Sequence, residues 1–269
     1  MSTILITGCS SGFGLLTALE FARGGDDVYA GVRDADTADQ LRAAAEQHEQ
    51  LSMVVIDVVD PASVEACVSG VIAASGRIDV LVNNAAVATF AAVEDTDDDE
   101  ARRIMETNFM GPLRVTRAVL PQMRAQGGGR VILVSSVNGF IGMPFTGVYS
   151  ASKFALEAMG EALAMEVAQM GITVSIVQPG PYHTAIDAKL ALTEPSDAFP
   201  GAADAVAAGR YAIASDHPEE VAGAIVAAAR AQPVPLRVPV GAVAEQLYQA
   251  RRAMDDEAFF PHLITLMGG

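Results

Sequence analysis

Two side chains with complementary chemistry, Tyr149 and Lys153, lie four residues apart, where a loop rich in small residues precedes an apolar helical pattern over residues 154–170. On a helix, residues four apart share one face. An ammonium beside a phenol favours the phenolate and lowers the phenol pKa toward neutral pH. The spacing therefore predicts that Tyr149 can serve as a general acid or base. Because this spacing must arise by chance in many helices, its weight depends on the elements around it.

A glycine-rich turn near the N-terminus predicts a phosphate site. The apolar, β-branched run at residues 2–7 predicts a buried strand, and residues 15–23 have a helical pattern. Between them, Gly8 allows a sharp turn, Gly12 lets a pyrophosphate approach the backbone, and Gly14 lets the helix pack on the strand. The phosphates would bind the N–H groups at the positive end of the helix. The alternative is a glycine-rich turn that binds no ligand.

The end of the second predicted strand, residues 27–32, bears on the choice between NADP(H) and NAD(H). Folds of this kind that prefer NAD place an acid there for the ribose 2′-hydroxyl. Here the next residue is Arg33, whose guanidinium suits a 2′-phosphate, and Ser11 could add a hydroxyl donor. We therefore predict NADP(H). In the alternative, which uses NAD(H), Arg33 is a surface residue and Asp34 binds the ribose.

The next two predicted strands also end in polar or small residues. After the strand at 52–56, Asp57 could accept a hydrogen bond from an adenine amino group or cap the next helix, which Asp60 and a proline open and which runs to about residue 75. The strand at 78–82 precedes Asn83, Asn84 and Ala85. Small residues there would let backbone approach a ligand, and the asparagine side chains can bridge neighbouring strands.

A long helical region at 100–126 contains Asn108, followed by a glycine and a proline. These are poor residues for a helix interior, so they predict a bulge where a side chain or water enters the backbone ladder. Three glycines then end the helix, and the strand at 130–134 delivers Ser136 just past its end. The last strand of this series, at 172–177, leads into the loop 179–184.

Strands that alternate with helices, each strand a continuous apolar run, predict an α/β fold. We expect a doubly wound parallel sheet of about seven strands, a Rossmann fold with helices on both faces, in a single domain over residues 1–269. The candidate residues all fall just past the carboxyl ends of strands. In an open α/β sheet that edge binds the ligand.

The ordered set of motifs resembles the short-chain dehydrogenase/reductase family. The resemblance covers residues 3–184, and the serine-to-tyrosine spacing of 13 (149 − 136) is typical of the family. Residues 8–12, 28–34, 148–157 and 181–184 are similar to the 17β-hydroxysteroid and retinol dehydrogenase branch. The chain departs from the family at Ala86, where a glycine is usual, and follows no usable pattern after Thr184. The residues that carry the resemblance are Thr7, Gly8, Gly12, Gly14, Asn83, Asn84, Ala85, Asn108, Ser136, Tyr149 and Lys153.

The resemblance implies a role for each catalytic candidate. Tyr149 would be the general acid for a carbonyl oxygen, Ser136 would hydrogen-bond the same oxygen, and Lys153 would lower the Tyr149 pKa and hold the nicotinamide ribose. Asn108 would hold a water in the proton relay, and Thr184 with the backbone near residues 179–182 would fix the carboxamide. The implied cofactor-binding residues are Gly8, Ser10, Ser11, Gly12, Phe13, Gly14, Arg33, Asp57, Val58, Asn83, Ala85, Tyr149, Lys153, Pro179, Gly180 and Thr184.

Composition excludes several other classes of function. The formal net charge of −16 argues against nucleic acid and anionic membranes as partners. The acidic run at 94–100 predicts a helix that begins near Asp99 rather than a metal site. Cys9 and Cys67 have neither a disulfide framework nor metal-ligand spacing. With no apolar run near the ~20 residues of a membrane span and no signal peptide, we expect a cytoplasmic protein.

The C-terminal third is expected to shape the substrate site. The family resemblance places a mobile substrate lid at 185–215, before a helix at 218–231 and a strand at 236–240. A helical extension over 241–269 carries Phe259 and Phe260, which look exposed and are candidates to cover the pocket or a partner subunit.

We therefore expect an NADP(H)-dependent oxidoreductase for a hydrophobic secondary alcohol or ketone, of the steroid, retinoid or aryl-ketone kind. The family resemblance also implies a homodimer or homotetramer. The alternatives are an NAD-dependent dehydrogenase of a polar alcohol or sugar, and a catalytically silent dinucleotide-binding regulator. The intact serine, tyrosine and lysine set counts against the regulator, since a sensor needs no acid/base tyrosine.

Overall fold

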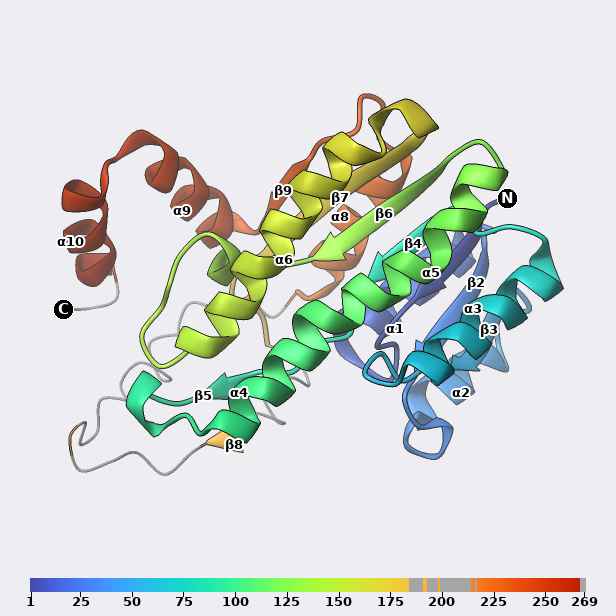
Figure 1. Ribbon diagram of the computed structural model, residues 1–269, viewed down its shortest axis with the longest axis horizontal. Helices are drawn as coiled ribbons and strands as arrows, with labels where there is room; N and C mark the ends of the chain where they lie inside the picture. The colour runs from blue at the N-terminus through green and yellow to red at the C-terminus, as the bar shows by residue number, and fades with distance from the viewer. Residues whose placement is uncertain (184–190, 193–197, 199–213, 216, 267–269) are drawn as a thin grey trace.

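A seven-stranded parallel sheet forms the centre of the protein in a computed structural model (Figure 1), which describes residues 1–183, 191–192, 198, 214–215 and 217–266. The strand order is β3-β2-β1-β4-β6-β7-β9, so the crossover direction reverses between β1 and β4. This confirms the predicted doubly wound fold. The strands are β1 (Thr3–Ile6), β2 (Asp27–Val32), β3 (Leu51–Val55), β4 (Val80–Asn83), β6 (Gly129–Val134), β7 (Ile172–Pro179) and β9 (Arg237–Val240).

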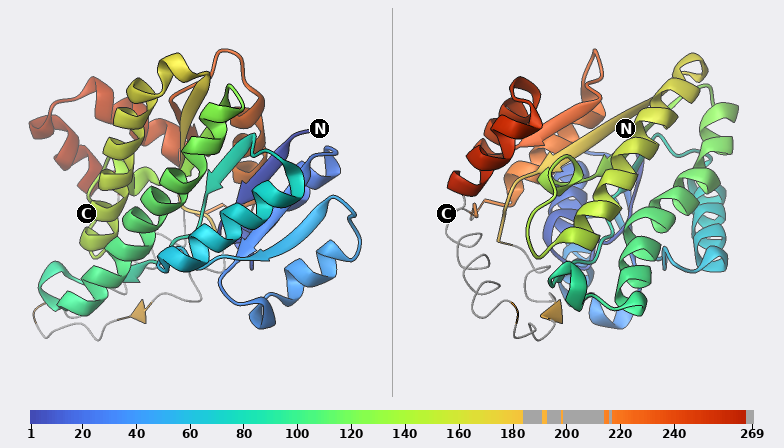
Figure 2. Two further views of the ribbon diagram at one scale, coloured as in Figure 1. Left: turned by 45° about the vertical axis from the view of Figure 1, so that its right-hand side comes forward. Right: turned by 60° about the vertical axis from the view of Figure 1, so that its left-hand side comes forward.

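Helices cover both faces of the sheet (Figure 2) because its strands are apolar on both sides. In β1, Ile4 packs into one core cluster and Leu5 into the other, as expected when successive side chains point to opposite faces. One cluster is covered by α1 (Gly12–Arg23), α2 (Asp39–Ala45) and α8 (Glu219–Arg230). The other is covered by α3 (Pro61–Ser75), α5 (Gly111–Ala125) and α6 (Gly147–Glu166).

The structure corrects two predicted helices. The helix that carries Tyr149 begins at Gly147, not at residue 154, so both Tyr149 and Lys153 lie within α6. The helix predicted over 100–126 is divided into α4 (Asp98–Met105), a π-helical segment η3 (Glu106–Met110) and α5. Because Asn108 lies in η3, the predicted bulge is confirmed.

Short elements fill the connections. The 3₁₀ turns are η1 (Ala35–Thr37), η2 (Val93–Asp95), η4 (Val137–Gly139) and η5 (Ala168–Met170). A second, two-stranded sheet pairs β5 (Thr89–Phe90) with β8 (Ala191–Leu192). Apart from residues 191–192, 198 and 214–215, the predicted lid at 185–215 lies outside the described residues.

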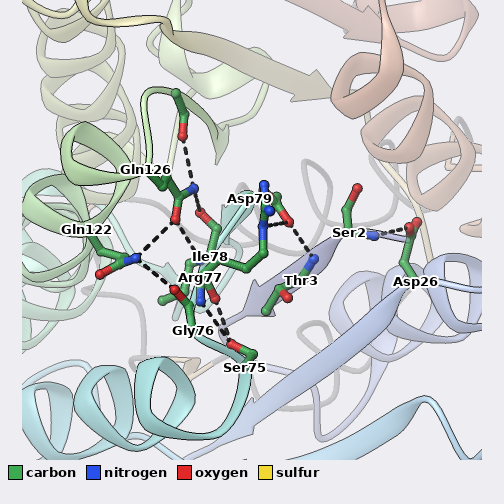
Figure 3. Close-up of polar contacts among 11 residues, drawn as sticks. Ser2, Thr3, Asp26, Ser75, Gly76, Arg77, Ile78, Asp79, Gln122 and Gln126 are labelled. Carbon is green, nitrogen blue, oxygen red and sulfur yellow. Dashed lines mark hydrogen bonds and ion pairs between the residues drawn. The ribbon is translucent and has the colours of Figure 1, made fainter.

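Side chains close the sheet at its amino edge, opposite the predicted site (Figure 3). Asp79 accepts a hydrogen bond from the backbone N–H of Thr3 at 2.8 Å and pairs with Arg77. Gln126, just past α5, bonds both the N–H and the carbonyl of Ile78. These side chains bond the backbone N–H and carbonyl groups at this edge, so those groups contribute to the packing of the strands and are not available to a ligand.

Two C-terminal helices, α9 (Ala242–Ala253) and α10 (Asp256–Leu266), pack on the loop that follows β6. Phe259 is 0% exposed and shares a core cluster with Val137 and Ile141, whereas Phe260 is 46% exposed. The expectation that both phenylalanines are exposed is therefore wrong for Phe259. In the part of the chain that is described, no helix has the length and apolar character to cross a bilayer.

Candidate functional site

The parallel register brings the ends of six strands to one edge of the sheet. The candidate residues from the sequence that follow these ends and lie in described segments are Gly8 after β1, Arg33 after β2, Asp57 after β3, Ala85 after β4, Ser136 after β6 and Gly180 after β7. Neighbouring β1 and β4 are tied together there, because Asn84 Nδ2 donates to the carbonyls of Thr7 and Gly8 at 2.9 and 3.1 Å. The predicted bridging of strands by an asparagine is thus confirmed.

Tyr149 and Lys153 face the same side of α6, with the lysine Nζ 5.7 Å from the centre of the phenol ring. Lys153 is buried, and its Nζ donates a 2.9 Å hydrogen bond to the carbonyl of Val134 on β6. Burial disfavours the charged ammonium and lowers the pKa of Lys153 to about 8, although the carboxylate of Glu157 acts in the opposite direction. The lysine therefore stays mostly protonated at neutral pH.

Ser136 is held in place by its own loop. Ser136 precedes the turn η4, and its Oγ accepts a 3.2 Å hydrogen bond from the backbone N–H of Asn138 within that turn. The side chain of Asn138 reaches across to α6, where Nδ2 donates to Ser150 Oγ at 2.9 Å and to Thr146 Oγ1 at 2.8 Å. Asn138 therefore links the Ser136 loop to the helical turn that carries Tyr149.

Asn108 joins the π-helical segment to the same helix. It is buried, and both ends of its amide bond the backbone of Val87 at 2.8 Å. Its Nδ2 also donates to Ser152 Oγ at 3.0 Å, and that hydroxyl donates to the carbonyl of Tyr149 at 2.7 Å. The bulge thus places Asn108 against the backbone of the candidate acid.

The glycine-rich turn has the shape and polarity that a pyrophosphate requires. Gly8 and Gly12 have φ values of 75° and 59°, and a Cβ on Gly14 would lie 2.3 Å from the carbonyl oxygen of Gly8. Helix α1 begins there with no acidic residue in its first turn and no side-chain cap from Ser11. Its N–H groups and helix dipole are therefore available to an anion, and the residues present fit a dinucleotide phosphate.

Cys9, within this turn, is unsuited to thiolate chemistry. Its side chain is buried, and burial raises the pKa of the thiol well above its usual range. The turn therefore offers backbone donors and small side chains. Ser10, Ser11 and Phe13 complete the predicted phosphate loop and are partly exposed.

Arg33 and Asp34 differ in their surroundings. The Asp34 carboxylate accepts a 2.9 Å hydrogen bond from the N–H of Asp36 and caps η1. Arg33 is exposed, and within the described residues its guanidinium has no ion pair or hydrogen bond. The carboxylate thus has a structural task, while the cation is available to a ligand.

The residues predicted near the adenine ring lie in different surroundings, one bonded within its own loop and two buried in the interior. Asp57 Oδ1 accepts from the N–H of Val59 at 3.1 Å, and Asp60, not Asp57, caps α3. Val58 is buried under α5, where a Cβ on Gly111 would meet it. Asn83 is buried too: its Nδ2 donates to Thr116 Oγ1 at 3.0 Å, so its side chain is turned to the interior.

The loop after β7 is anchored at its start. Gly180 N–H donates to the carbonyl of Val240 at 3.0 Å, next to Pro179 at the end of β7. Tyr182 is buried against Phe13, and its hydroxyl donates to Glu220 at 2.9 Å; burial and this carboxylate raise the pKa of the phenol. Thr184 lies outside the described residues.

The sequence analysis assigned no role to several residues of the site. Thr7 Oγ1 accepts the N–H groups of Asn84 and Ala85, both at 3.0 Å, and so shapes the end of β4. Asn138, Ser150 and Ser152 hold the turn around Tyr149. The sequence shows a polar residue at each of these positions, but the hydrogen-bond partner of each comes from another element and cannot be read from the sequence. Among them, Thr7 offered a signal, because it belongs to the motifs that carry the family resemblance.

Comparisons with known proteins agree with this site. A family model described as short chain dehydrogenase matches residues 2–195. The 3-ketodihydrosphingosine reductase of Bacteroides thetaiotaomicron is 36% identical over 250 residues, which cover 91% of this chain and 90% of that protein. Human retinol dehydrogenase 8 is 38% identical and human 17-beta-hydroxysteroid dehydrogenase type 1 is 39% identical, over 74% and 70% of this chain. The matched region spans 65% and 59% of those two proteins.

Solved structures give the same result. A short-chain dehydrogenase from Streptomyces avermitilis has a TM-score of 0.82 and 34% identity, over 94% of this chain and 93% of that one. A gluconate 5-dehydrogenase from Burkholderia cenocepacia, in complex with NADP and tartrate, has a TM-score of 0.74 and 27% identity, over 88% and 92% of the two chains. The fold, the family match and these relatives together show that the chain is an oxidoreductase that belongs to the short-chain dehydrogenase family.

Proposed function

We propose that the protein is an NADP(H)-dependent oxidoreductase that interconverts a secondary alcohol and a ketone on a hydrophobic substrate. The observation that carries this proposal is the placement of Tyr149 and buried Lys153 on one helix face, with Nζ 5.7 Å from the phenol ring. A buried ammonium beside a phenol is an acid/base device, and a purely structural helix has no use for it.

The proposed roles follow from the contacts of each side chain. Tyr149 donates a proton to the substrate oxygen in reduction and accepts it in oxidation, with its pKa lowered by the Lys153 charge. Ser136, whose Oγ is oriented by the N–H of Asn138, donates a hydrogen bond to the same oxygen. Asn108 supports the turn through Ser152 and holds a water near Lys153. The bound dinucleotide supplies or accepts the hydride.

The proposed cofactor site uses the edge described above. The N–H groups at the start of α1 hold the pyrophosphate, and the exposed Arg33 pairs with the 2′-phosphate of NADP(H). Lys153 also holds the nicotinamide ribose, and the backbone at Pro179 and Gly180 holds the carboxamide. The engagement of the Asp34 carboxylate in its own turn supports NADP(H) over NAD(H).

A hydrophobic substrate is supported by the loop between Ser136 and Tyr149. In this loop Phe145 is partly exposed and stacks on Phe90 of β5, whereas Phe140, Ile141 and Met143 pack against α9 and α10. The names of three relatives also refer to sphingoid, retinoid and steroid compounds, which are all largely apolar. Both observations favour steroid-, retinoid- or aryl-ketone-like substrates over sugars.

Self-association and location complete the proposal. On α6, Phe154 and Met165 are 45% and 75% exposed. A groove between α5 and α6 is lined by apolar side chains such as Leu113, Leu120 and Met159, together with Arg117, Arg124 and Glu166. These apolar side chains support a homodimer or homotetramer through the two helices. Two buried free cysteines and the acidic charge support a cytoplasmic location.

The test is the substitution Tyr149→Phe, which removes the phenol hydroxyl and keeps the ring. We expect NADPH to bind as before while turnover on a panel of steroids, retinoids and aryl ketones falls at least about 100-fold, the usual contribution of a general acid. The matched control is Tyr29→Phe on β2, away from the site, which should keep full activity. Turnover retained by Tyr149→Phe would refute the assignment. A wild-type protein that oxidises NADPH with none of the ketones would favour the silent regulator.

A further inference from the structure

A buried carboxylate with partners on two other elements lies one helical turn beyond Lys153. Glu157 is buried on α6. Its Oε1 accepts a 2.9 Å hydrogen bond from Gln178 Nε2 on β7, and its Oε2 accepts one of 2.9 Å from Arg237 Nε on β9. A buried charge needs such partners to offset its desolvation. The acid/base chemistry described above assigns no task to this carboxylate.

Glu157 also touches the loop that holds Ser136. A Cβ on Gly139 of η4 would lie 2.9 Å from Glu157 Cγ and 3.0 Å from Oε1, so the loop backbone packs directly on this side chain. The carboxylate is therefore enclosed by α6, β7, β9 and η4, one helical turn from Lys153. In such a low-dielectric place its charge acts strongly on a neighbour.

The charge that Glu157 acts on is Lys153. Burial lowers the pKa of Lys153 from 10.5 to about 8, and the Glu157 carboxylate opposes this shift. Lys153 also contacts the titratable phenol ring of Tyr149 and the uncharged Val134 carbonyl on β6. The side chains of Gln178, Asn108 and Asn138, which bond Glu157, Ser152 and Ser150 of α6, carry no charge. The charged groups of α4 pair with one another: Arg102 with Asp98 and Asp99, and Arg103 with Glu100.

We propose that Glu157 is a positioning residue whose carboxylate, held by Gln178 and Arg237, keeps Lys153 in its charged form beside Tyr149. Arg237 offsets part of this negative charge and so limits the effect. The inference rests on the proposed function, in which Tyr149 requires a charged lysine. Glu161, one turn further along α6, also pairs with Arg237 but is 49% exposed. It provides a matched control, because either glutamate alone leaves Arg237 with a partner.

The chain permits a direct test because it contains two lysines, Lys153 and Lys189. Protein labelled with ¹³Cε-lysine gives two signals, and Lys189→Arg assigns them. We expect Lys153 of the wild type to titrate near pH 8. In Glu157→Gln the midpoint should fall by about 0.5–1 pH unit, because the favourable charge is lost. In Glu161→Gln it should stay within about 0.2 unit, because that carboxylate is largely screened by solvent.

Arg237→Gln tests the same inference with the Glu157 carboxylate intact. Removal of the guanidinium leaves the negative charge less compensated, so the Lys153 midpoint should rise. This variant decides the matter if Glu157→Gln does not fold. An unchanged midpoint in Glu157→Gln, an equal fall in Glu161→Gln, or a fall in Arg237→Gln would each overturn the inference. The titration needs no turnover, so it stands apart from the Tyr149→Phe result, which alone decides the proposed function.

Discussion

At the scale of single residues, the choice of dinucleotide depends on two adjacent side chains after β2. The Asp34 carboxylate accepts a hydrogen bond from the N–H of Asp36, and Arg33 is exposed to solvent. A carboxylate that caps a turn would have to give up that hydrogen bond to hold a ribose. An exposed guanidinium gives up only hydration when it pairs with a phosphate, so the balance favours NADP(H).

We predict that Arg33→Ala lowers kcat/KM with NADPH by about 10- to 100-fold, the loss expected for one charge-assisted contact. The value with NADH should change by less than about threefold, because NADH lacks the 2′-phosphate. Steady-state kinetics with both cofactors measure this, with Arg23→Ala at the far end of α1 as a control for loss of a surface cation. Equal losses with both cofactors would contradict the role of Arg33.

The individual site residues were predictable to the extent that their own chemistry marks them. Tyr149, Lys153 and Ser136 have side chains that suit acid/base work, and Asn108 is a poor helix residue in a helical run. Neither the residue type nor the position of Glu157 and Asn138 in the sequence indicated a role. Their importance comes from partners 12 to 80 residues away, Ser150 for Asn138 and Arg237 for Glu157, and a sequence does not display such pairings.

At the scale of elements, the junction of β1 and α1 depends on close contact between three backbone segments. Gly14 in α1 lies so near the turn that a Cβ would be 2.3 Å from Gly8 O and 2.5 Å from Asn84 Nδ2. The same asparagine ties the ends of β1 and β4 together. The packing of α1 on the sheet and the shape of the phosphate turn therefore depend on the absence of a Cβ at Gly14.

We predict that Gly14→Ala destabilises the protein by about 1–3 kcal/mol through overpacking and weakens NADPH binding at least about tenfold, because the Gly8 turn must shift. The matched control is Gly70→Ala in α3, where a Cβ meets nothing within 4 Å. That change should stabilise the protein by about 0.5–1 kcal/mol, the helix propensity difference. Urea unfolding and titration with NADPH measure both effects. Tight cofactor binding by Gly14→Ala would show that the turn tolerates the methyl group.

The elements themselves were predictable where the apolar pattern defines them, as in the seven strands of the main sheet. The start of α6 was not, because residues 147–152 contain glycine, serine and β-branched residues of modest helix propensity. Contacts of Asn138 with Thr146 and Ser150 hold that first turn in place. Phe259 was misjudged for a similar reason: its core partners Val137 and Ile141 come from a loop more than a hundred residues earlier.

At the scale of the whole molecule, the burial of Lys153 reduces stability. Lys153 is 2% exposed, and its pKa falls from 10.5 to about 8 on folding. This fall corresponds to about 3 kcal/mol of lost stability when the lysine is protonated in both the folded and the unfolded state. The hydrogen bond to the Val134 carbonyl recovers about 1 kcal/mol. Folding therefore tolerates a net cost at Lys153, and a protein selected for stability alone would have an apolar side chain there.

We predict that Lys153→Met abolishes turnover yet raises the free energy of unfolding by about 1–2 kcal/mol at pH 7. Because the folded pKa is the lower one, the unfolded chain binds more protons between about pH 8 and 10.5, so wild-type stability at this residue recovers as the pH rises through that window. The advantage of Lys153→Met should accordingly shrink at pH 9.5. Urea unfolding of the cofactor-free chain at both pH values measures it. An advantage as large at pH 9.5 as at pH 7 would mean that shape, and not the buried charge, limits stability at this position.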